Sequence, residues 1–242
     1  MKQVFVDIDC ENLRSLELDE KQAHHIFDVL RTTPKEKIRI IDVNKKVYLG
    51  HVESKPELKI DEEIEVQSNG IDITLCCALI KQDKFEWMLQ KACELQVTRI
   101  VPFESKNTVV KIDEKKINKK IARWNEILLA ACKQCNRIDI PKLEGVVQIQ
   151  DLKNYKSAIN LVAYEKESDP SHHMAHYLKN LNTSITVCIG PEGGFDAKEI
   201  TLLNKLGYSN CSLGTSILRA ETAACYVLSA IEYQSHVEKE SI

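Results

Sequence analysis

The sequence lacks any apolar run of the roughly 18 to 20 residues that a membrane-spanning helix requires. It also lacks the long apolar core of a signal peptide, because its first segment turns acidic at Asp7. We therefore expect a soluble, cytoplasmic protein without a membrane partner. In that reducing compartment the nine cysteines are expected to remain thiols rather than form a disulfide framework.

Phosphate-binding and metal-binding motifs are missing as well. The chain has no G-x-G-x-x-G sequence and no P-loop, so neither a dinucleotide nor ATP is indicated as a ligand. His172, His173 and His176, and separately Cys132 and Cys135, have spacings found in metal sites, but no further ligand completes either set. We expect no metal, and we expect the histidines to belong to a solvated helix start and the cysteines to be two thiols of an ordinary helix.

An overall basic excess is also absent, since the formal net charge is −3. The charge is nevertheless unevenly distributed. Residues 1–70 hold 11 Lys and Arg against 15 Asp and Glu, a net −4, whereas residues 106–142 hold 10 against 4, a net +6. A concentrated basic patch can bind phosphate on a neutral background, although charge alone also fits a solvated, salt-rich helix face.

The first 70 residues have the pattern of a small β-rich domain. Four segments favour strands, namely residues 4–6, 37–43, 46–52 and 62–67. One helix is expected over residues 19–30, with Asp19 as its N-cap. The Asn69-Gly70 turn marks a boundary, so residues 1–70 are predicted to form a small barrel-like domain.

From residue 71 onward, strands and helices alternate. Strands are expected at residues 73–80, 99–102, 158–164, 185–189 and 209–213. Helices are expected near residues 85–95, 116–136, 171–179, 196–206 and 221–234, followed by a frayed tail at 237–242. This alternation predicts an α/β domain over residues 71–242, with a parallel sheet covered by helices on both faces.

Two glycine-bearing loops each follow a buried-type strand and precede a helix: IGPEGGF at residues 189–195 and LGTSILRAETA at 213–223. Ligands bind parallel sheets at the carboxyl ends of the strands, where glycines let backbone groups approach closely. We therefore expect both loops to share one ligand site, to which the second brings Arg219, Glu221 and Thr222. The plainer alternative is a helix-start carboxylate at Glu221 and a surface ion pair at Arg219.

The two loops, read as IGPEGGF and LG-x-x-ILRAETA, strongly resemble those of the 16S rRNA uridine-N3 methyltransferases of the SPOUT superfamily. The resemblance runs along nearly the whole chain. Residues 25–31 are similar to H-I-x-x-V-L-R, residues 91–102 to K-A-x-E-L-G…P, and residues 124–141 to W-x-x-I…A…Q…R…P. It implies an N-terminal PUA-like β-barrel that binds RNA and a SPOUT α/β domain with a C-terminal deep trefoil knot, in which the loops hold S-adenosylmethionine.

The resemblance also implies a homodimer that methylates 16S rRNA within the small ribosomal subunit. The predicted C-terminal helix offers a face for dimerisation through Ala223, Val227, Leu228 and Ile231. Two alternatives stay open. One is a related enzyme that acts at another RNA atom, such as ribose 2′-O, and the other is a non-catalytic RNA-binding or ribosome-assembly protein on the same fold.

Three positions depart from the family pattern. Residues 105–108, SKNT, stand where the family has S-x-R-S, Ser216 stands where arginine is common, and Gln96 replaces a glycine. The first two departures remove guanidinium groups expected to face RNA, so they affect RNA contacts more than the class of reaction. From the basic segment and the resemblance together, we expect RNA to be bound by Arg31, Lys106, Asn107, Lys119, Lys120, Arg123 and Arg137.

The chemistry of the implied reaction suggests roles for the loop residues. N3 of uracil carries a proton at neutral pH, so the site must accept that proton and stabilise an anionic base. Arg219 is expected to stabilise or position the uracil, and Glu192 or Glu221 to accept the proton. The expected cofactor-binding residues are Gly190, Glu192, Gly193, Leu213, Gly214, Ile217, Leu218 and Ala220.

Overall fold

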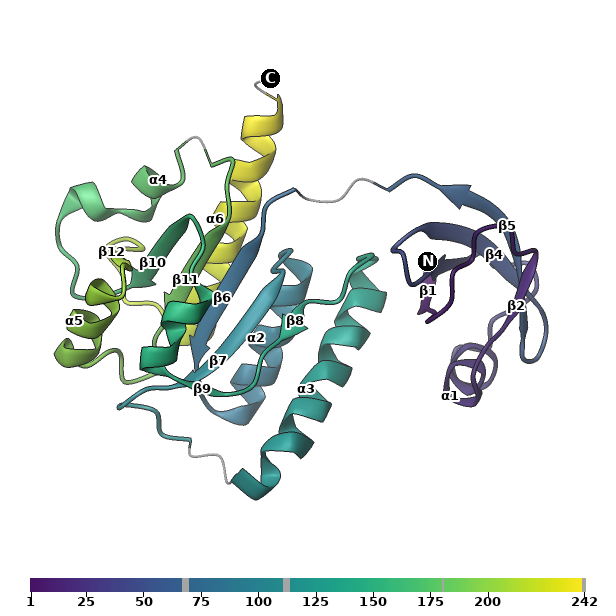
Figure 1. Cartoon of the computed structure of the whole chain (residues 1–242), viewed down its shortest axis with the longest axis horizontal. Helices are drawn as coiled ribbons and strands as arrows, with labels where there is room; N and C mark the ends of the chain where they lie inside the picture. Colours follow the sequence, from purple (N-terminus) through teal and green to yellow (C-terminus); the bar gives the residue numbers. More distant parts are fainter. Residues whose placement is uncertain (67–69, 111–113, 180, 241–242) are drawn as a thin grey trace. The chain divides into compact units, whose positions relative to one another are not determined.

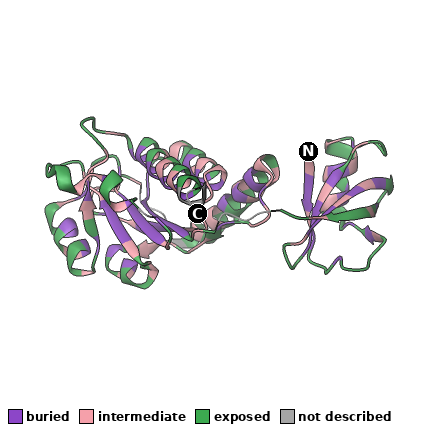
Figure 2. Ribbon diagram, turned by 90° about the horizontal axis from the view of Figure 1, so that it is seen from above, coloured by how far each residue is buried: buried purple, intermediate pink, exposed green. Residues whose placement is uncertain are grey.

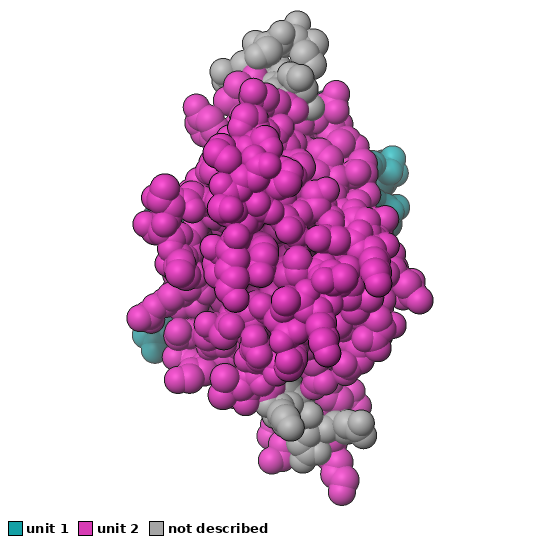
Figure 3. All heavy atoms as spheres, turned by 90° about the vertical axis from the view of Figure 1, so that its left-hand side faces the viewer, with its two compact units in different colours: residues 1–68, 130–139 teal, residues 69–129, 140–242 magenta. Residues whose placement is uncertain are grey.

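The computed structural model of the chain describes residues 1–66, 70–110, 114–179 and 181–240. Two compact units are present (Figure 3): residues 1–68 with 130–139, and residues 69–129 with 140–242. Residues 130–139, grouped with the second domain by the sequence pattern, therefore cluster with the first unit. The expected boundary residue Asn69 lies outside the described residues.

The first unit is built on a curled, five-stranded half-barrel sheet (Figure 1), where the sequence predicted a small barrel. Its strands are β1 (Lys2–Phe5), β2 (Ser15–Glu17), β3 (Ile38–Ile41), β4 (Val47–Ser54) and β5 (Glu57–Ile64). They follow the order β1-β3-β4-β5-β2, with β1 and β3 parallel and the other neighbours antiparallel. Alternate strand residues meet in one core, including Val4, Ile38, Ile40, Val52 and Leu58.

The helical segment of this unit begins as predicted and then changes its pitch. The Asp19 carboxylate accepts a hydrogen bond from the Gln22 amide at 2.7 Å and caps α1 (Glu20–Ala23). The chain continues as a π-helix, η1 (His24–Val29). The predicted helix over residues 19–30 is therefore confirmed in position, but its second half has a wider turn than the 3.6-residue period implies.

The second unit contains a sheet whose paired strands run parallel, as predicted. Its strands are β6 (Ile73–Ala78), β7 (Arg99–Glu104), β8 (Lys142–Leu143), β9 (Val147–Gln148), β10 (Ile159–Ala163), β11 (Ile185–Ile189) and β12 (Ser209–Cys211). The order is β12-β10-β11-β6-β7-β8, and β9 also pairs with β7. Two-residue strands such as β8 and β9 are too short to show a period in sequence.

The helices of this unit are α2 (Gln82–Glu94), α3 (Glu114–Cys135), η2 (Ile149–Tyr155), η3 (Pro170–His172), α4 (Met174–Tyr177), α5 (Ala197–Lys205) and α6 (Ala220–Glu240), except that α3 from residue 130 onward clusters with the first unit. The helix predicted from residue 196 is confirmed as α5, and its start is fixed by a capping box of Asp196 and Glu199. Two expectations were wrong. A single helix at 171–179 is replaced by two short ones, and α6 continues to Glu240, where a frayed tail was expected from 237.

Helices cover both faces of the sheet in the second unit. Figure 1 shows α5 on one face, where it contacts η2, and α6 on the other, where it contacts α2 and β11. Buried residues concentrate along the strands (Figure 2). Cys76 and Cys188 are neighbours across β6 and β11 and are fully buried, and burial raises the pKa of the Cys76 thiol to about 12. In the described part of the chain, no helix combines the length and apolarity needed to cross a membrane.

Candidate functional site

A pocket of about 460 Å³ lies at the carboxyl ends of three strands in the second unit. The loop after β11 lines it with residues 189–195, and the loop after β12 with residues 212–220. These are the two glycine-bearing loops that the sequence predicted to share one site. Residues 163–165, at the end of β10, line it as well, because β10 lies between β11 and β12 in the sheet.

The loop after β10 was missed because it carries no glycine motif. Tyr164 and Glu165 simply follow an apolar strand, and sequence alone does not show that this strand lies between β11 and β12. Glu165 approaches the first glycine loop closely. A Cβ atom added at Gly194 would lie 2.7 Å from the Glu165 Oε1 atom, and Gly194 has a φ of +67°. The positive φ therefore favours glycine at this position, whereas the Glu165 carboxylate is the end of a flexible side chain and could shift.

The second loop ends where α6 begins and presents apolar groups to the pocket. Ile217 is 81% exposed, although it lines the pocket together with Leu213 and Leu218. Ala220 and Ala223 are buried and form the part of the wall contributed by α6. An exposed aliphatic side chain beside open backbone is suited to packing against a flat apolar ring.

Charged side chains reach the pocket from three elements. Arg219 is exposed at its rim, and its backbone carbonyl accepts the Ala223 amide of α6 at 2.7 Å. Glu192 is exposed in the first loop, and its Oε1 atom accepts the backbone amide of Lys81 at 3.2 Å. Lys84, from the first turn of α2, also lines the pocket and was not singled out in sequence, because a lone lysine in an amphipathic helix is unremarkable.

Glu221 is placed behind the pocket rather than in its wall. Its Oε1 atom lies 3.4 Å from the Lys84 ammonium nitrogen, and its side chain is 14% exposed. The Oε2 atom is buried without a hydrogen-bond partner among the residues that the structure describes. Of the three predicted catalytic residues, Arg219 and Glu192 thus line the pocket, while Glu221 reaches it only through Lys84. Thr222 is exposed on α6 and is not among the lining residues.

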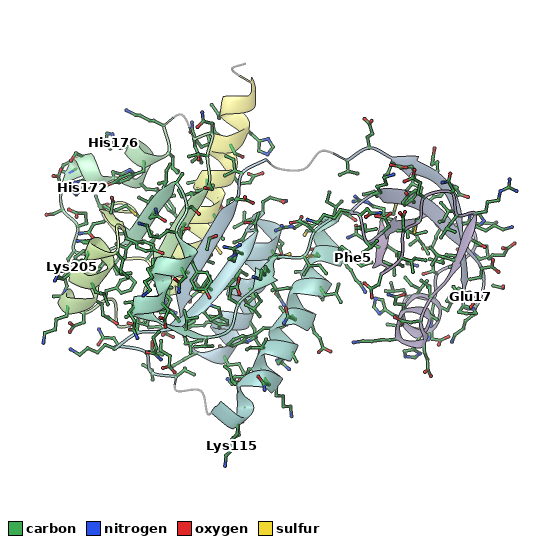
Figure 4. The ribbon with its side chains drawn as sticks, viewed as in Figure 1. Phe5, Glu17, Lys115, His172, His176 and Lys205 are labelled. Atoms are coloured by element: carbon green, nitrogen blue, oxygen red, sulfur yellow. The ribbon has the colours of Figure 1, made fainter. Side chains whose placement is uncertain are left out.

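The residues expected to bind RNA have different environments. Lys119, Lys120 and Arg123 lie on α3, whose first turns also carry Lys115 (Figure 4). The Arg123 guanidinium forms two 2.7 Å bonds with the Glu86 carboxylate, which raise the pKa of Arg123 and lower that of Glu86. The ion pair within the protein partly neutralises the expected basic surface there. Lys111, also in the +6 segment, lies outside the described residues.

Two further residues of this set belong to the first unit. Arg31 is exposed directly after the π-helix, with a φ of +46°. Arg137, by contrast, is buried, and its Nη2 atom lies 2.8 Å from Asp139 Oδ2. The Gln3 side-chain amide donates to the Arg137 carbonyl at 2.6 Å. The prediction that Arg137 contacts RNA is therefore corrected, because its guanidinium is used inside the unit.

Lys106 and Asn107 lie next to the first glycine loop. The Lys106 ammonium group is 2.6 Å from Asp196 Oδ2, and the Asn107 amide donates to the Gly193 and Gly194 carbonyls at 3.3 and 3.0 Å. Neither contact was predicted from the sequence.

Within the described residues, no group of three or more His, Cys, Asp and Glu side chains could hold a metal ion. His172 is 3.3 Å from Glu167, and it belongs to η3, whereas His176 belongs to α4; both are labelled in Figure 4.

Comparison with known protein families gives matches over both units. A family model described as an RNA methyltransferase domain matches residues 67–232, and one described as an RNA methyltransferase PUA domain matches residues 18–63. The methyltransferase match includes all three pocket loops.

Individual relatives match along nearly their whole length. The Ribosomal RNA small subunit methyltransferase E of Bacillus subtilis (strain 168) is 31% identical over 252 residues, with 98% of each chain covered. The protein of the same name from Rickettsia conorii is 27% identical, covering 95% of this chain and 94% of that one. The solved structure of Ribosomal RNA small subunit methyltransferase E from Neisseria gonorrhoeae, bound to S-adenosyl methionine, has a TM-score of 0.84 at 25% identity, with 96% and 97% covered.

Proposed function

The chain belongs to the RNA methyltransferase family, and from that membership we propose that it transfers the methyl group of S-adenosylmethionine to small-subunit ribosomal RNA. One observation carries the proposal: the two family-like loops meet in a single pocket at the carboxyl ends of β11 and β12. A structure of high similarity is bound to the same cofactor. The narrower proposal is that the methylated atom is N3 of a uridine in 16S rRNA, and that the reaction takes place in the cytoplasm.

The pocket fits S-adenosylmethionine in size and lining. Its volume of about 460 Å³ lies within the range typical of small-molecule sites, roughly 300 to 1,000 Å³. The proposed cofactor-binding residues all line it: Gly190, Glu192, Gly193, Leu213, Gly214, Ile217, Leu218 and Ala220. When bound, the cofactor supplies an electrophilic methyl group on a sulfonium. The exposed Ile217 side chain would pack against its adenine, and the open glycine backbone would approach its polar groups.

The charged groups of the pocket would prepare the base for attack. A uracil that loses its N3 proton carries negative charge on N3, O2 and O4, and a preorganised cation stabilises such an anion strongly in a dry site. Arg219 would supply that cation, because it lines the pocket and its guanidinium has no bonded partner among the described residues. Glu192 is the proposed proton acceptor. Lys84, held by Glu221, would add a second positive charge.

We also propose a homodimer and a trefoil knot in the second unit, both implied by the family resemblance. The helix residues first expected to form the dimer face do not serve that purpose, because Ala223, Val227, Leu228 and Ile231 are buried in their own unit. The same helix exposes Tyr226, Tyr233 and Val237, which offer an apolar surface instead. Sedimentation of an active monomer at assay concentration would contradict the dimer.

The reaction is tested by methyl transfer from labelled cofactor to small subunits that lack the modification, followed by analysis of the nucleosides. We expect 3-methyluridine. Recovery of a 2′-O-methylated nucleoside would show that the target atom is wrong while the reaction class is right. A protein that binds neither the cofactor in calorimetry nor transfers label would instead be a non-catalytic RNA-binding protein of the same fold.

A further inference from the structure

Residues 105–108, which follow β7, form a compact turn against the first glycine loop. The turn is closed on itself, because the Thr108 amide donates to the Ser105 carbonyl at 3.0 Å and the Ser105 amide donates to the Thr108 hydroxyl at 3.1 Å. The sequence singled out this segment as a departure from the related S-x-R-S pattern and assigned it to RNA. Its contacts point inward, to the wall of the pocket.

One side of the turn is fixed by the buried carboxylate of Glu199. Its Oε1 atom accepts the Lys106 amide at 2.8 Å, and its Oε2 atom accepts the Ser105 hydroxyl at 3.1 Å. Glu199 is also the capping-box residue of α5, and Oε2 accepts the Asp196 amide at 2.9 Å. A single carboxylate therefore joins the turn to the residue at which the glycine loop ends and α5 begins.

The other side of the turn is fixed by Asn107. A side-chain amide has two N–H donors, and the Asn107 amide meets two consecutive carbonyls of the loop, those of Gly193 and Gly194. The Asn107 side chain also packs closely against Gly193, since a Cβ atom added at Gly193 would lie 3.1 Å from the Asn107 Cβ. Gly193 and Gly194 both line the pocket, whereas Asn107 does not. Gly194 therefore lies next to both the Glu165 carboxylate and the Asn107 amide, and Asn107 is the one that bonds to it.

From this geometry we infer that Asn107 is a positioning residue for the cofactor, which acts by holding the Gly193-Gly194 backbone in the conformation that forms the pocket. This inference rests on the proposed function, because it assumes that S-adenosylmethionine binds there. It replaces the expectation that Asn107 contacts RNA. Asn107 stands where the related pattern has arginine, and its amide donates its hydrogen bonds to groups of the protein itself.

The test compares cofactor binding by calorimetry in full-length Asn107→Ala, Asn107→Asp and Asn125→Ala. Asn125 is the matched control, because its amide also donates to a backbone carbonyl, that of Ile121 at 3.0 Å, but within α3. Losing two weak hydrogen bonds that steady the loop should raise the Kd of Asn107→Ala roughly 10-fold, which corresponds to about 1.4 kcal/mol. The control should bind like the wild type.

Asn107→Asp separates hydrogen bonding from packing. The two side chains have the same shape, but a carboxylate facing two carbonyl oxygens cannot donate to them. We expect this variant to bind the cofactor at least as weakly as Asn107→Ala, to raise KM for the cofactor more than it lowers kcat, and to keep the wild-type Kd for RNA. Wild-type cofactor affinity in both variants would overturn the inference, as would a loss confined to RNA binding. Failure of the wild type to bind S-adenosylmethionine would instead refute the proposed function.

Discussion

Replacing Arg219 by alanine separates catalysis from cofactor binding most directly. The side chain is exposed, and it makes no hydrogen bond or ion pair with any residue that the structure describes. The start of α6 does not depend on it, because only the Arg219 backbone carbonyl bonds to Ala223. Truncation should therefore change the free energy of unfolding by no more than about 0.5 kcal/mol, as is usual at a surface position.

The effect on the rate should be much larger. Loss of one preorganised donor to a transition-state anion typically reduces the rate on the order of 10²–10³-fold, or about 3 to 4 kcal/mol. Arg219→Lys should recover only part of this, since an ammonium keeps the charge but loses the planar fork that can span N3 and a carbonyl oxygen of uracil. The difference in rate between the wild type and Arg219→Lys measures the geometric part of the contribution, and the difference between Arg219→Lys and Arg219→Ala measures the part due to charge.

The assay is single-turnover methyl transfer from labelled cofactor to undermodified small subunits, at saturating cofactor, with the cofactor Kd measured in parallel. Lys198→Ala is a suitable control, because Lys198 is an exposed cation of the same unit that does not line the pocket. If the cofactor Kd of Arg219→Ala rises while its rate at saturating cofactor equals that of the wild type, then Arg219 only binds the cofactor and the catalytic assignment is wrong.

The other predictions concern RNA, metal, thiols and the first unit. Replacing Lys119 and Lys120 by alanine should flatten the fall of RNA affinity with salt, by about 0.7 to 0.9 log units per lost phosphate contact, with cofactor affinity unchanged; an unaltered slope would contradict this. Dialysis against EDTA should leave cofactor binding intact. Native protein should protect Cys76 from iodoacetamide until denaturant is added, because burial raises its pKa to about 12. Gly50→Ala should destabilise the first unit by about 3 kcal/mol, seen in its thermal transition, since the added Cβ would lie 2.2 Å from the Lys59 carbonyl oxygen.

Much of the fold could be predicted because its elements carry strong local signals. The strand β11 begins and ends where its apolar run does, and α5 begins where the Asp196 capping box places it. Signals of this kind are absent from β2, β8 and β9, which have two or three residues each and no period to detect. The end of α6 was placed too early, because its polar last turns resemble a solvated tail.

The site was predicted less completely, because its composition depends on the order of strands. Residues 163–165 and Lys84 enter the pocket only once β10 lies between β11 and β12 and α2 lies beside α6. Similar reasoning applies to Asn107, whose partners at Gly193 and Gly194 are more than 80 residues away in sequence. Motifs identify the loops that carry chemistry, but the residues that hold those loops are set by tertiary contacts.

The identity of the proton acceptor can be narrowed by the same geometry. Glu221 is an unsuitable acceptor, because it lies behind Lys84 and does not line the pocket. Two carboxylates do line it in the described residues, Glu165 and Glu192. Glu165 lies against the Gly194 backbone, whereas Glu192 is exposed and bonds the Lys81 amide through Oε1, which leaves Oε2 without a hydrogen-bond partner among the described residues. We therefore propose Glu192 as the proton acceptor, and Glu221 as the residue that keeps Lys84 in place.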